Sequence, residues 1–328
     1  MTRLLLPLFA LLLGGCSKLA VYEPDHIAGK LSYDERLEAP IAAQTPQGAT
    51  LENGRLLFAR SQGAQNLPEG YLLLGIDGGW ISAANSQGGL LLRHESGAEH
   101  RFNLPSRVLS AATDGRSAAV STQDNSHRLI DLASGQTPFL VREKPMLAVS
   151  ARRARPLLGQ TQAVFPTLDG KLLIVDRAKN EVVREQVLGT EPFFANPIFL
   201  AEHEGAVIAA THERVIALGK NGGFNAIERN VRLLAPLQSG LYLFTLDGTV
   251  TRLSGSLETL ESVKLPYARI VAAAEGDALY AVEQSGWLIR LSPDLKNYQT
   301  YELPDDIRAP LLAAEEKLYY GRKAVRWP

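Results

Sequence analysis

Short apolar runs separated by polar turns recur along the chain at a near-constant spacing. The sequence Thr-Leu-Asp-Gly occurs at residues 167–170 and again at residues 245–248, so the copies lie 245 − 167 = 78 residues apart. Midway between them, residues 207–218 show the same order of apolar run, polar turn and apolar run. Asp-Gly between two such runs is typical of a β-hairpin, because its tight turn needs positive φ at both central residues. The pattern predicts a repeated hairpin with a period of about 39 residues.

Eight equivalent turns can be placed along the chain after residue 50. Their spacing varies from 33 to 45 residues, and the interval 322 − 53 = 269 covers seven steps. No useful stretch after residue 16 has the periodicity of an amphipathic helix, so an all-β chain of eight units is expected. The turns begin at Asn53, Ser86, Asp124, Asp169, His212, Asp247, Ser285 and Arg322.

Each unit divides into four short strands whose polarity changes from the first to the last. In the seventh unit these strands are residues 269–274, 278–282, 287–291 and 298–303. The first is small and apolar, and the last alternates polar with apolar residues. A β-propeller blade needs this gradient, because its inner strand packs around the axis while its outer strand is half exposed. We therefore predict an eight-bladed β-propeller of four-stranded blades over residues 30–328.

The two ends of the body are expected to meet. Residues 307–327 provide only three strands, and residues 30–37 are predicted to supply the missing outer strand, which would close the ring and remove exposed edges. Two alternatives remain. The unit at residues 41–70 is short and could complete the last blade, which would give seven blades. A pair of β-sandwiches is the rival all-β architecture, although a single repeat across the body disfavours it.

The first residues have the pattern of an export signal. A cation at Arg3 precedes an apolar run over residues 4–13, which is far shorter than the ~20 residues needed to span a bilayer. Residues 13–16, Leu-Gly-Gly-Cys, resemble the bacterial lipobox, in which the cysteine is lipidated after cleavage. The resemblance implies a signal peptide at residues 1–15, a palmitate-bearing lipid anchor on Cys16 and a tether over residues 16–29. Ser17, by its resemblance to sorting signals, implies the outer membrane, with the protein facing the periplasm. An ordinary signal peptide with a chance cysteine is the alternative.

Composition narrows the possible chemistry. The formal net charge is −1, so no global field attracts nucleic acid, and nucleic-acid binding is not expected. Cys16 is the only cysteine, so a lipidated mature chain has no thiol for a disulfide, a zinc–thiolate site or a nucleophile. The six histidines form no metal-binding spacing, and the recurrent aspartates resemble turn residues. We expect no metal, no cofactor and no catalytic residues.

Three arginines within four residues stand out in the fourth unit. Arg152, Arg153 and Arg155 repel one another unless they are solvated or paired. A solvated loop would explain them. A partner-binding patch would explain them as well, because arginine is favoured at interface hot spots and binds carboxylates in a bidentate manner.

Several units resemble the pyrroloquinoline-quinone-type repeat of β-propellers. The matches are residues 129–135 and 173–181, with a weaker one at residues 215–222, and all lack the usual tryptophan. A lipobox followed by an eight-bladed propeller resembles the BamB family of outer-membrane lipoproteins. That resemblance implies a scaffold of the β-barrel assembly machinery that binds a partner protein's periplasmic domain. The quinone-dependent dehydrogenases share the repeat but imply a calcium and quinone site and, in many members, a vicinal disulfide that this chain cannot form.

The sequence therefore predicts a non-catalytic scaffold. We expect a membrane-tethered periplasmic propeller that binds a periplasmic or outer-membrane protein, as in outer-membrane protein assembly. A propeller that binds a small molecule or carbohydrate in its central funnel is one alternative. An accessory protein of a periplasmic respiratory complex is another.

Overall fold

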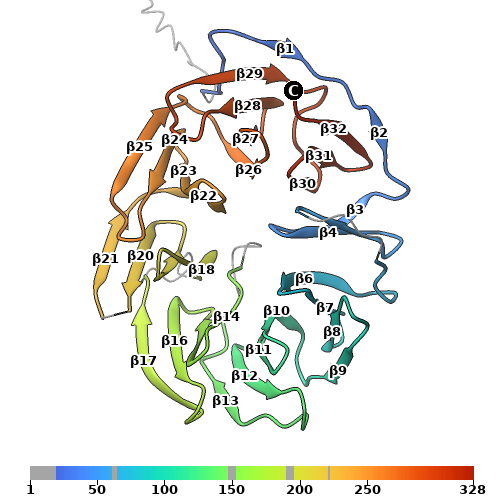
Figure 1. The fold of residues 1–328 in the computed structure, drawn as a ribbon, viewed down its shortest axis with the longest axis vertical. Helices are drawn as coiled ribbons and strands as arrows, with labels where there is room; N and C mark the ends of the chain where they lie inside the picture. Colours follow the sequence, from blue (N-terminus) through green and yellow to red (C-terminus); the bar gives the residue numbers. More distant parts are fainter. Residues whose placement is uncertain (1–19, 61–64, 147–152, 190–195, 221) are drawn as a thin grey trace, which may run out of the picture.

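The protein is a closed ring of β-sheets (Figure 1). The computed structural model describes residues 20–60, 65–146, 153–189, 196–220 and 222–328, and these residues form eight sheets. The sheets follow one another around a central axis, so the prediction of an eight-bladed propeller is confirmed over both the seven-bladed ring and the paired sandwiches. None of the described segments forms a helix with the length and hydropathy needed to cross a bilayer.

Blades 2 to 4 each consist of four antiparallel strands in sequence order, from the axis outward. Blade 4 differs in its inner strand, which is only two residues long and follows Pro156, a residue without a backbone donor. Blade 2 comprises β6 (Leu72–Asp77), β7 (Trp80–Ala84), β8 (Gly89–His94) and β9 (Glu99–Asn103). Blade 3 comprises β10 (Val108–Thr113), β11 (Ser117–Thr122), β12 (Ser126–Asp131) and β13 (Phe139–Arg142). Blade 4 comprises β14 (Leu157–Leu158), β15 (Gln162–Pro166), β16 (Lys171–Asp176) and β17 (Glu181–Val187).

Blades 5 to 7 repeat this plan. The strands of blade 7 agree with the predicted segments to within one residue at each end, because the alternation of small, apolar and polar residues is clearest there. Blade 5 comprises β18 (Phe199–His203), β19 (Ala206–Ala210), β20 (Arg214–Gly219) and β21 (Phe224–Glu228). Blade 6 comprises β22 (Val231–Leu237), β23 (Gly240–Thr245), β24 (Thr249–Leu253) and β25 (Thr259–Lys264). Blade 7 comprises β26 (Ile270–Glu275), β27 (Leu279–Glu283), β28 (Trp287–Leu291) and β29 (Tyr298–Glu302).

The start of the chain closes the ring. Blade 8 contains β30 (Leu311–Ala313), β31 (Lys317–Tyr320) and β32 (Lys323–Arg326), and its outer strand is β2 (Glu35–Arg36), which pairs antiparallel with β32. The predicted closure by residues 30–37 is thus confirmed. One strand earlier, β1 (Gly29–Lys30) pairs in parallel with β29 and adds a fifth strand to blade 7. The N-terminal segment therefore holds two neighbouring blades.

Blade 1 departs from the four-stranded plan. It contains β3 (Ile41–Thr45), β4 (Gly48–Leu51) and β5 (Leu56–Phe58), so it has three strands among the described residues. A single bridge between Arg55 and Asn66 stands in place of a regular outer strand. This blade is the short unit at residues 41–70, for which a seven-bladed ring was the alternative prediction.

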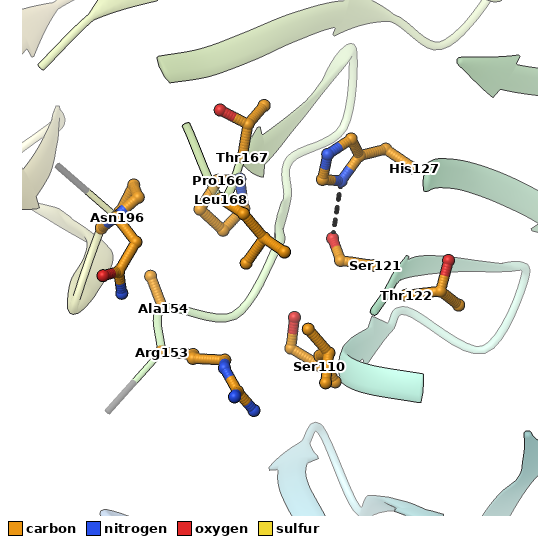
Figure 2. A pocket seen from close by; sticks show the side chains of 12 residues that line it. Ser110, Ser121, Thr122, His127, Arg153, Ala154, Pro166, Thr167, Leu168 and Asn196 are labelled. Atoms are coloured by element: carbon orange, nitrogen blue, oxygen red, sulfur yellow. Dashed lines mark hydrogen bonds between the residues drawn. The ribbon is translucent and has the colours of Figure 1, made fainter. Parts of the chain in front are cut away.

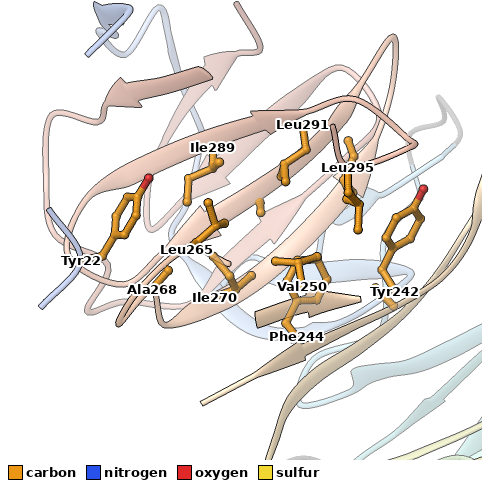
Figure 3. Close-up of a cluster of buried hydrophobic side chains, with 13 residues drawn as sticks. Tyr22, Tyr242, Phe244, Val250, Leu265, Ala268, Ile270, Ile289, Leu291 and Leu295 are labelled. Atoms are coloured by element: carbon orange, nitrogen blue, oxygen red, sulfur yellow. The ribbon is translucent and has the colours of Figure 1, made fainter. Parts of the chain in front are cut away.

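Neighbouring blades pack through apolar side chains, and the packing extends beyond the predicted propeller boundary. Blades 6 and 7 share a cluster that includes Phe244, Val250, Ile289 and Tyr22 (Figure 3). Tyr22 is 4% exposed, and its hydroxyl lies 3.1 Å from that of Thr300 in β29. Within the stretch assigned to the tether, Tyr22 therefore packs against the ring.

A hydrogen-bonding side chain ends the second strand of most blades. The hydroxyls of Thr122 and Thr245 both donate across the following turn to an aspartate two residues later, at 2.6 Å and 2.5 Å. Thr211 and Asn85 instead accept backbone amides of their turns. The Thr-Leu-Asp-Gly repeat is thus a turn that is closed by its own side chains.

Antiparallel pairing gives the ring two distinct faces. The turns between the second and third strands of each blade lie on the same side as the connections between blades, and we call this side the linker face. The other turns lie on the opposite side, which we call the hairpin face. The two faces follow from the strand order, since successive strands reverse direction.

Candidate functional site

Five cationic side chains gather on the linker face at blades 3 and 4. β12 starts and β13 ends at this face, and two connections between blades join them there. The members are Arg107, Arg128, Arg142, Lys144 and Arg153, which we call the cation cluster. Four of them are exposed, and Arg128 is 6% exposed.

None of the five forms an ion pair among the residues that the structure describes, whereas the cations beside them do. Lys171 Nζ lies 2.8 Å from a carboxylate oxygen of Glu143, and this hydrogen bond raises the pKa of Lys171 to about 12. Arg177 lies 2.6 Å from Asp114. The described residues thus leave one group of cations without ion-paired carboxylates in a region where other cations have them.

Electrostatic repulsion and burial disfavour the charged forms of two arginines in the cation cluster. Burial and the neighbouring Arg107 lower the pKa of Arg153. Burial also lowers the pKa of Arg128, with attraction from Asp124 opposing and repulsion from Arg142 adding to that effect. The Nε of Arg128 is buried and has no hydrogen-bond partner among the described residues. An approaching carboxylate would relieve both effects, because a guanidinium binds carboxylates through paired hydrogen bonds.

A buried polar network lies beneath the surface that carries the cation cluster. Asn125, in left-handed backbone geometry with φ of 59°, accepts the amide of Leu168 through Oδ1 at 3.0 Å and thereby joins blades 3 and 4. The same oxygen lies 3.2 Å from Nε2 of His127, so Nε2 carries the proton. Nδ1 of His127 then accepts the hydroxyl of Ser121 at 2.9 Å. Burial lowers the pKa of His127 to about 4, so the ring stays neutral.

A cavity of about 10 Å³ lies beside this network (Figure 2). His127, Ser110, Arg153 and Asn196 are among the side chains around it. Such a volume has room for one water molecule and for no larger ligand. The described residues therefore form no pocket for a small-molecule ligand at this place.

Arg155 lies within the ring and bridges the inner strands. Its guanidinium donates to the carbonyl of Ala111 in blade 3 at 2.8 Å and 3.0 Å and to Asp77 in blade 2 at 2.5 Å. It also donates to Gln47 of blade 1 at 2.8 Å. A Cβ on Gly75 would lie 2.0 Å from Arg155 Cζ, so only glycine leaves room for this side chain. Arg155 therefore connects four blades.

The predicted site residues thus differ in their placement. Arg153 belongs to the cation cluster, and Arg155 is bonded within the chain. Arg152 and Cys16 lie outside the described residues. Sequence reasoning missed Arg107, Arg128, Arg142 and Lys144, because they are far apart along the chain. The strand register could have indicated them, since Arg107, Arg142 and Lys144 lie at or next to strand ends on the linker face and Arg128 lies two residues after the start of β12.

No group of three or more His, Cys, Asp or Glu side chains within the described ranges is arranged to hold a metal ion. The recurrent aspartates are turn residues in the structure. Asp131 accepts the amide of Ser134, and Asp176 accepts those of Ala178 and Lys179. Their recurrence is explained by the architecture.

The sequence itself identifies the family. The profile of the PQQ_2 family, described as outer membrane protein assembly factor BamB, matches residues 49–294, about three quarters of the chain. The chain belongs to the BamB family. The predicted resemblance is confirmed.

Two curated relatives have a name other than BamB. Both are plasminogen-binding proteins PgbB from strains of Helicobacter pylori, 33% identical over 205 residues and 32% identical over 204 residues. Each match covers 61% of this chain and 38% of the relative, so the chain matches well under half of the relatives' length. The family and these relatives together support a protein-interaction propeller.

Solved structures share the fold. BamB from Moraxella catarrhalis has a TM-score of 0.63 at 16% identity, with 90% of this chain and 100% of that chain covered. The C-terminal WD40 domain of Sif2 has a TM-score of 0.65 at 13% identity, with 92% and 100% covered. The designed protein Ika8 has a TM-score of 0.58 at 12% identity, with 91% and 99% covered. At these identities the likeness concerns the propeller fold alone.

Proposed function

We propose that this protein is a non-catalytic scaffold of outer-membrane protein assembly that binds an acidic segment of a partner protein. The observation that carries the proposal is the cation cluster, whose five members lack carboxylate partners among the described residues. A partner that supplies carboxylates would satisfy them. Membership of the BamB family supports the assembly role.

The proposal places the protein on the periplasmic side of the outer membrane, held by lipid on Cys16. The lipobox-like residues 13–16 and the family match support this location. The partner-binding role first assigned to Arg152, Arg153 and Arg155 is proposed here for Arg153 within the cation cluster. Arg152 precedes it directly in the sequence and lies outside the described residues.

Capture of the partner from envelope extracts tests the proposal. The native lipoprotein is purified after mild crosslinking, and its partners are identified by mass spectrometry. We expect an outer-membrane or periplasmic protein with an acidic segment. Recovery of the lipoprotein as a free monomer would count against a scaffold.

Charge reversal separates the cation cluster from the rest of the surface. The pair Arg107→Glu and Arg153→Glu should weaken capture severalfold, because acidic side chains would repel an acidic partner. Lys220→Glu is the matched control, since Lys220 is 76% exposed in its side chain and lies on the hairpin face. Equal capture by the cluster variant and the control would remove the cation cluster from the proposal.

A second candidate function is binding of a host protein. The similarity to plasminogen-binding proteins over 205 residues favours it. Immobilised mature protein is exposed to plasminogen and, separately, to the envelope partner. Saturable plasminogen binding that survives the cluster reversal would support a distinct host-protein surface, and absence of binding would assign that property to the remainder of the relatives' chains.

A further inference from the structure

Three apolar side chains on the linker face of blades 6 and 7 are unusually exposed. Val21 and Leu246 are each 51% exposed and Tyr267 is 56% exposed, and no other large hydrophobic side chain in the described ranges exceeds one half. Leu246 lies in the turn between β23 and β24, and Tyr267 lies in the connection between β25 and β26. Together with Arg269 they form what we call the apolar rim.

Close contacts hold the members of the apolar rim together. The carbonyl of Gly248 accepts the amide of Leu265 at 2.8 Å, and a Cβ on Gly248 would lie 1.9 Å from the carbonyl oxygen of Leu265. The turn that carries Tyr267 therefore lies directly against the turn that carries Leu246. Val21, Tyr267 and Arg269 line one cavity of about 200 Å³.

The backbone presents Tyr267 to solvent at a conformational cost. Its φ is +66°, a left-handed geometry that is unfavourable for an aromatic residue. The surrounding turn enforces this geometry, because the amide of Ala268 donates to Leu265 at 3.0 Å. An exposed aromatic ring held in a strained conformation indicates a contact that the isolated chain does not provide.

The charges of the apolar rim favour an anionic partner. Arg269 is exposed and has no side-chain partner among the described residues. Glu283, on the wall of the same cavity, is fully buried and accepts the amides of Arg269 and Ser285 at 3.1 Å and 2.6 Å. A tyrosine with aliphatic neighbours and a free arginine is the combination that suits a membrane–water interface.

The length of the tether before Tyr22 limits how far the apolar rim can lie from the membrane. Tyr22 is fixed in the core of blades 6 and 7, and Cys16 lies only six residues before it. Six residues span at most about 20 Å when fully extended. A lipid on Cys16 therefore keeps Tyr22, and with it the adjacent rim residue Val21, within about 20 Å of the bilayer surface.

We infer that the apolar rim rests on the membrane that holds the lipid anchor, with Tyr267 among the headgroups and Arg269 against anionic phospholipid. This inference rests on the proposed lipidation of Cys16. Blades 3 and 4 lie across the ring from blade 7 (Figure 1). The cation cluster shares the linker face, so a ring that stands on the edge formed by blades 6 and 7 keeps it away from the bilayer and open to a protein.

Site-directed fluorescence on the full-length mature lipoprotein tests the inference. Tyr267→Cys and, separately, Leu246→Cys are labelled with a small fluorophore, because the thiol of Cys16 is consumed by lipid. Lys296→Cys is the matched control, since it lies in blade 7 on the hairpin face and its side chain is 75% exposed. The proteins are reconstituted into vesicles of phosphatidylcholine and phosphatidylglycerol that carry nitroxide-labelled headgroups.

We expect severalfold quenching of the labels at positions 267 and 246 and unchanged fluorescence at position 296. Arg269→Gln in the Tyr267→Cys background should lower the quenching to the level seen on phosphatidylcholine alone. Vesicle-bound, acylated protein without quenching at either rim position would overturn membrane docking and leave the anchor intact. A mature chain with no acyl mass that does not float with vesicles would overturn both the anchor and the inference.

Discussion

Neighbouring arginines in this chain have opposite roles because their surroundings differ. Arg153 is exposed beside other cations, whereas Arg155, two residues later, donates hydrogen bonds to three other blades. From the sequence, both were candidates for one patch, because the spacing shows only that the two charges are close along the chain. Which of them is neutralised depends on Asp77 and Gln47, which lie 78 and 108 residues away. Contacts at such sequence separations could not be predicted without the ring.

Replacement of Arg155 should destabilise the ring. Arg155→Met leaves the partly buried Asp77 without its cation, and we expect the free energy of unfolding to fall by about 2 kcal/mol. Chemical denaturation measures this loss. Arg153→Met is the control and should change stability little, because that side chain has no ion pair in the described structure. Equal losses from both variants would contradict the bridging role of Arg155.

His127 should make stability depend on pH in a defined window. The buried ring has a pKa of about 4, against 6.5 for an unperturbed histidine. Between these values the unfolded chain binds a proton that the folded protein does not, so its stabilising contribution is complete above pH 6.5. As the pH falls to about 4, that contribution is lost, amounting to about 3 kcal/mol.

Denaturation of the wild-type protein and of His127→Gln across pH 4 to 7 checks this expectation. The wild-type protein should lose stability relative to the variant as the pH falls through the window. Parallel pH profiles for the two proteins would show that His127 does not titrate as its burial requires.

At the scale of the elements, the turn chemistry explains both the success and the limits of the sequence-based prediction. The Ser285-Gly286 turn and the alternating runs located the strands of blade 7 closely, because local hydrogen bonds and side-chain alternation determine them. The three-stranded blade 1 and the two-residue β14 were not predicted. Their form depends on Pro156 and on contacts with other blades, which periodicity does not encode.

Two glycines should respond differently to the same substitution. Gly248→Ala places a methyl group 1.9 Å from the carbonyl oxygen of Leu265 in left-handed backbone, and we expect a loss of about 3 kcal/mol. Gly97 also has positive φ, but nothing lies within 4 Å of an added Cβ. Gly97→Ala should therefore cost only about 1 kcal/mol. Thermal unfolding of both variants measures the difference, and similar losses would indicate that the turns are not in contact.

At the scale of the whole molecule, the cation cluster and the apolar rim both lie on the linker face, across the ring from each other (Figure 1). The sequence predicted the number of blades and the closing strand, because one repeat covers the entire body. It could not predict either surface. Each surface combines side chains from separate blades, and only the closed ring brings them together.

Removal of the N-terminal segment should open the ring. Deletion of residues 20–36 removes Tyr22, β1 and β2, which exposes the outer edges of blades 7 and 8. We expect a lower melting temperature and a greater tendency to aggregate, since unpaired edges recruit other strands. Calorimetry and light scattering measure both, and Tyr22→Ala separates the loss of packing from the loss of pairing. A deletion variant that remains as stable and monomeric as the Tyr22→Ala variant would show that β1 and β2 contribute little.

The parallel pairing of β1 with β29 also orders events in time. Gly29 lies opposite Tyr301, a separation of 301 − 29 = 272 residues. The ribosome makes β1 near the beginning of translation and β29 near its end. β1 therefore stays unpaired until late in the synthesis of the chain. Long-range pairings of this kind form slowly. An incomplete chain therefore lacks the partner for its own first strand until blade 7 has been made.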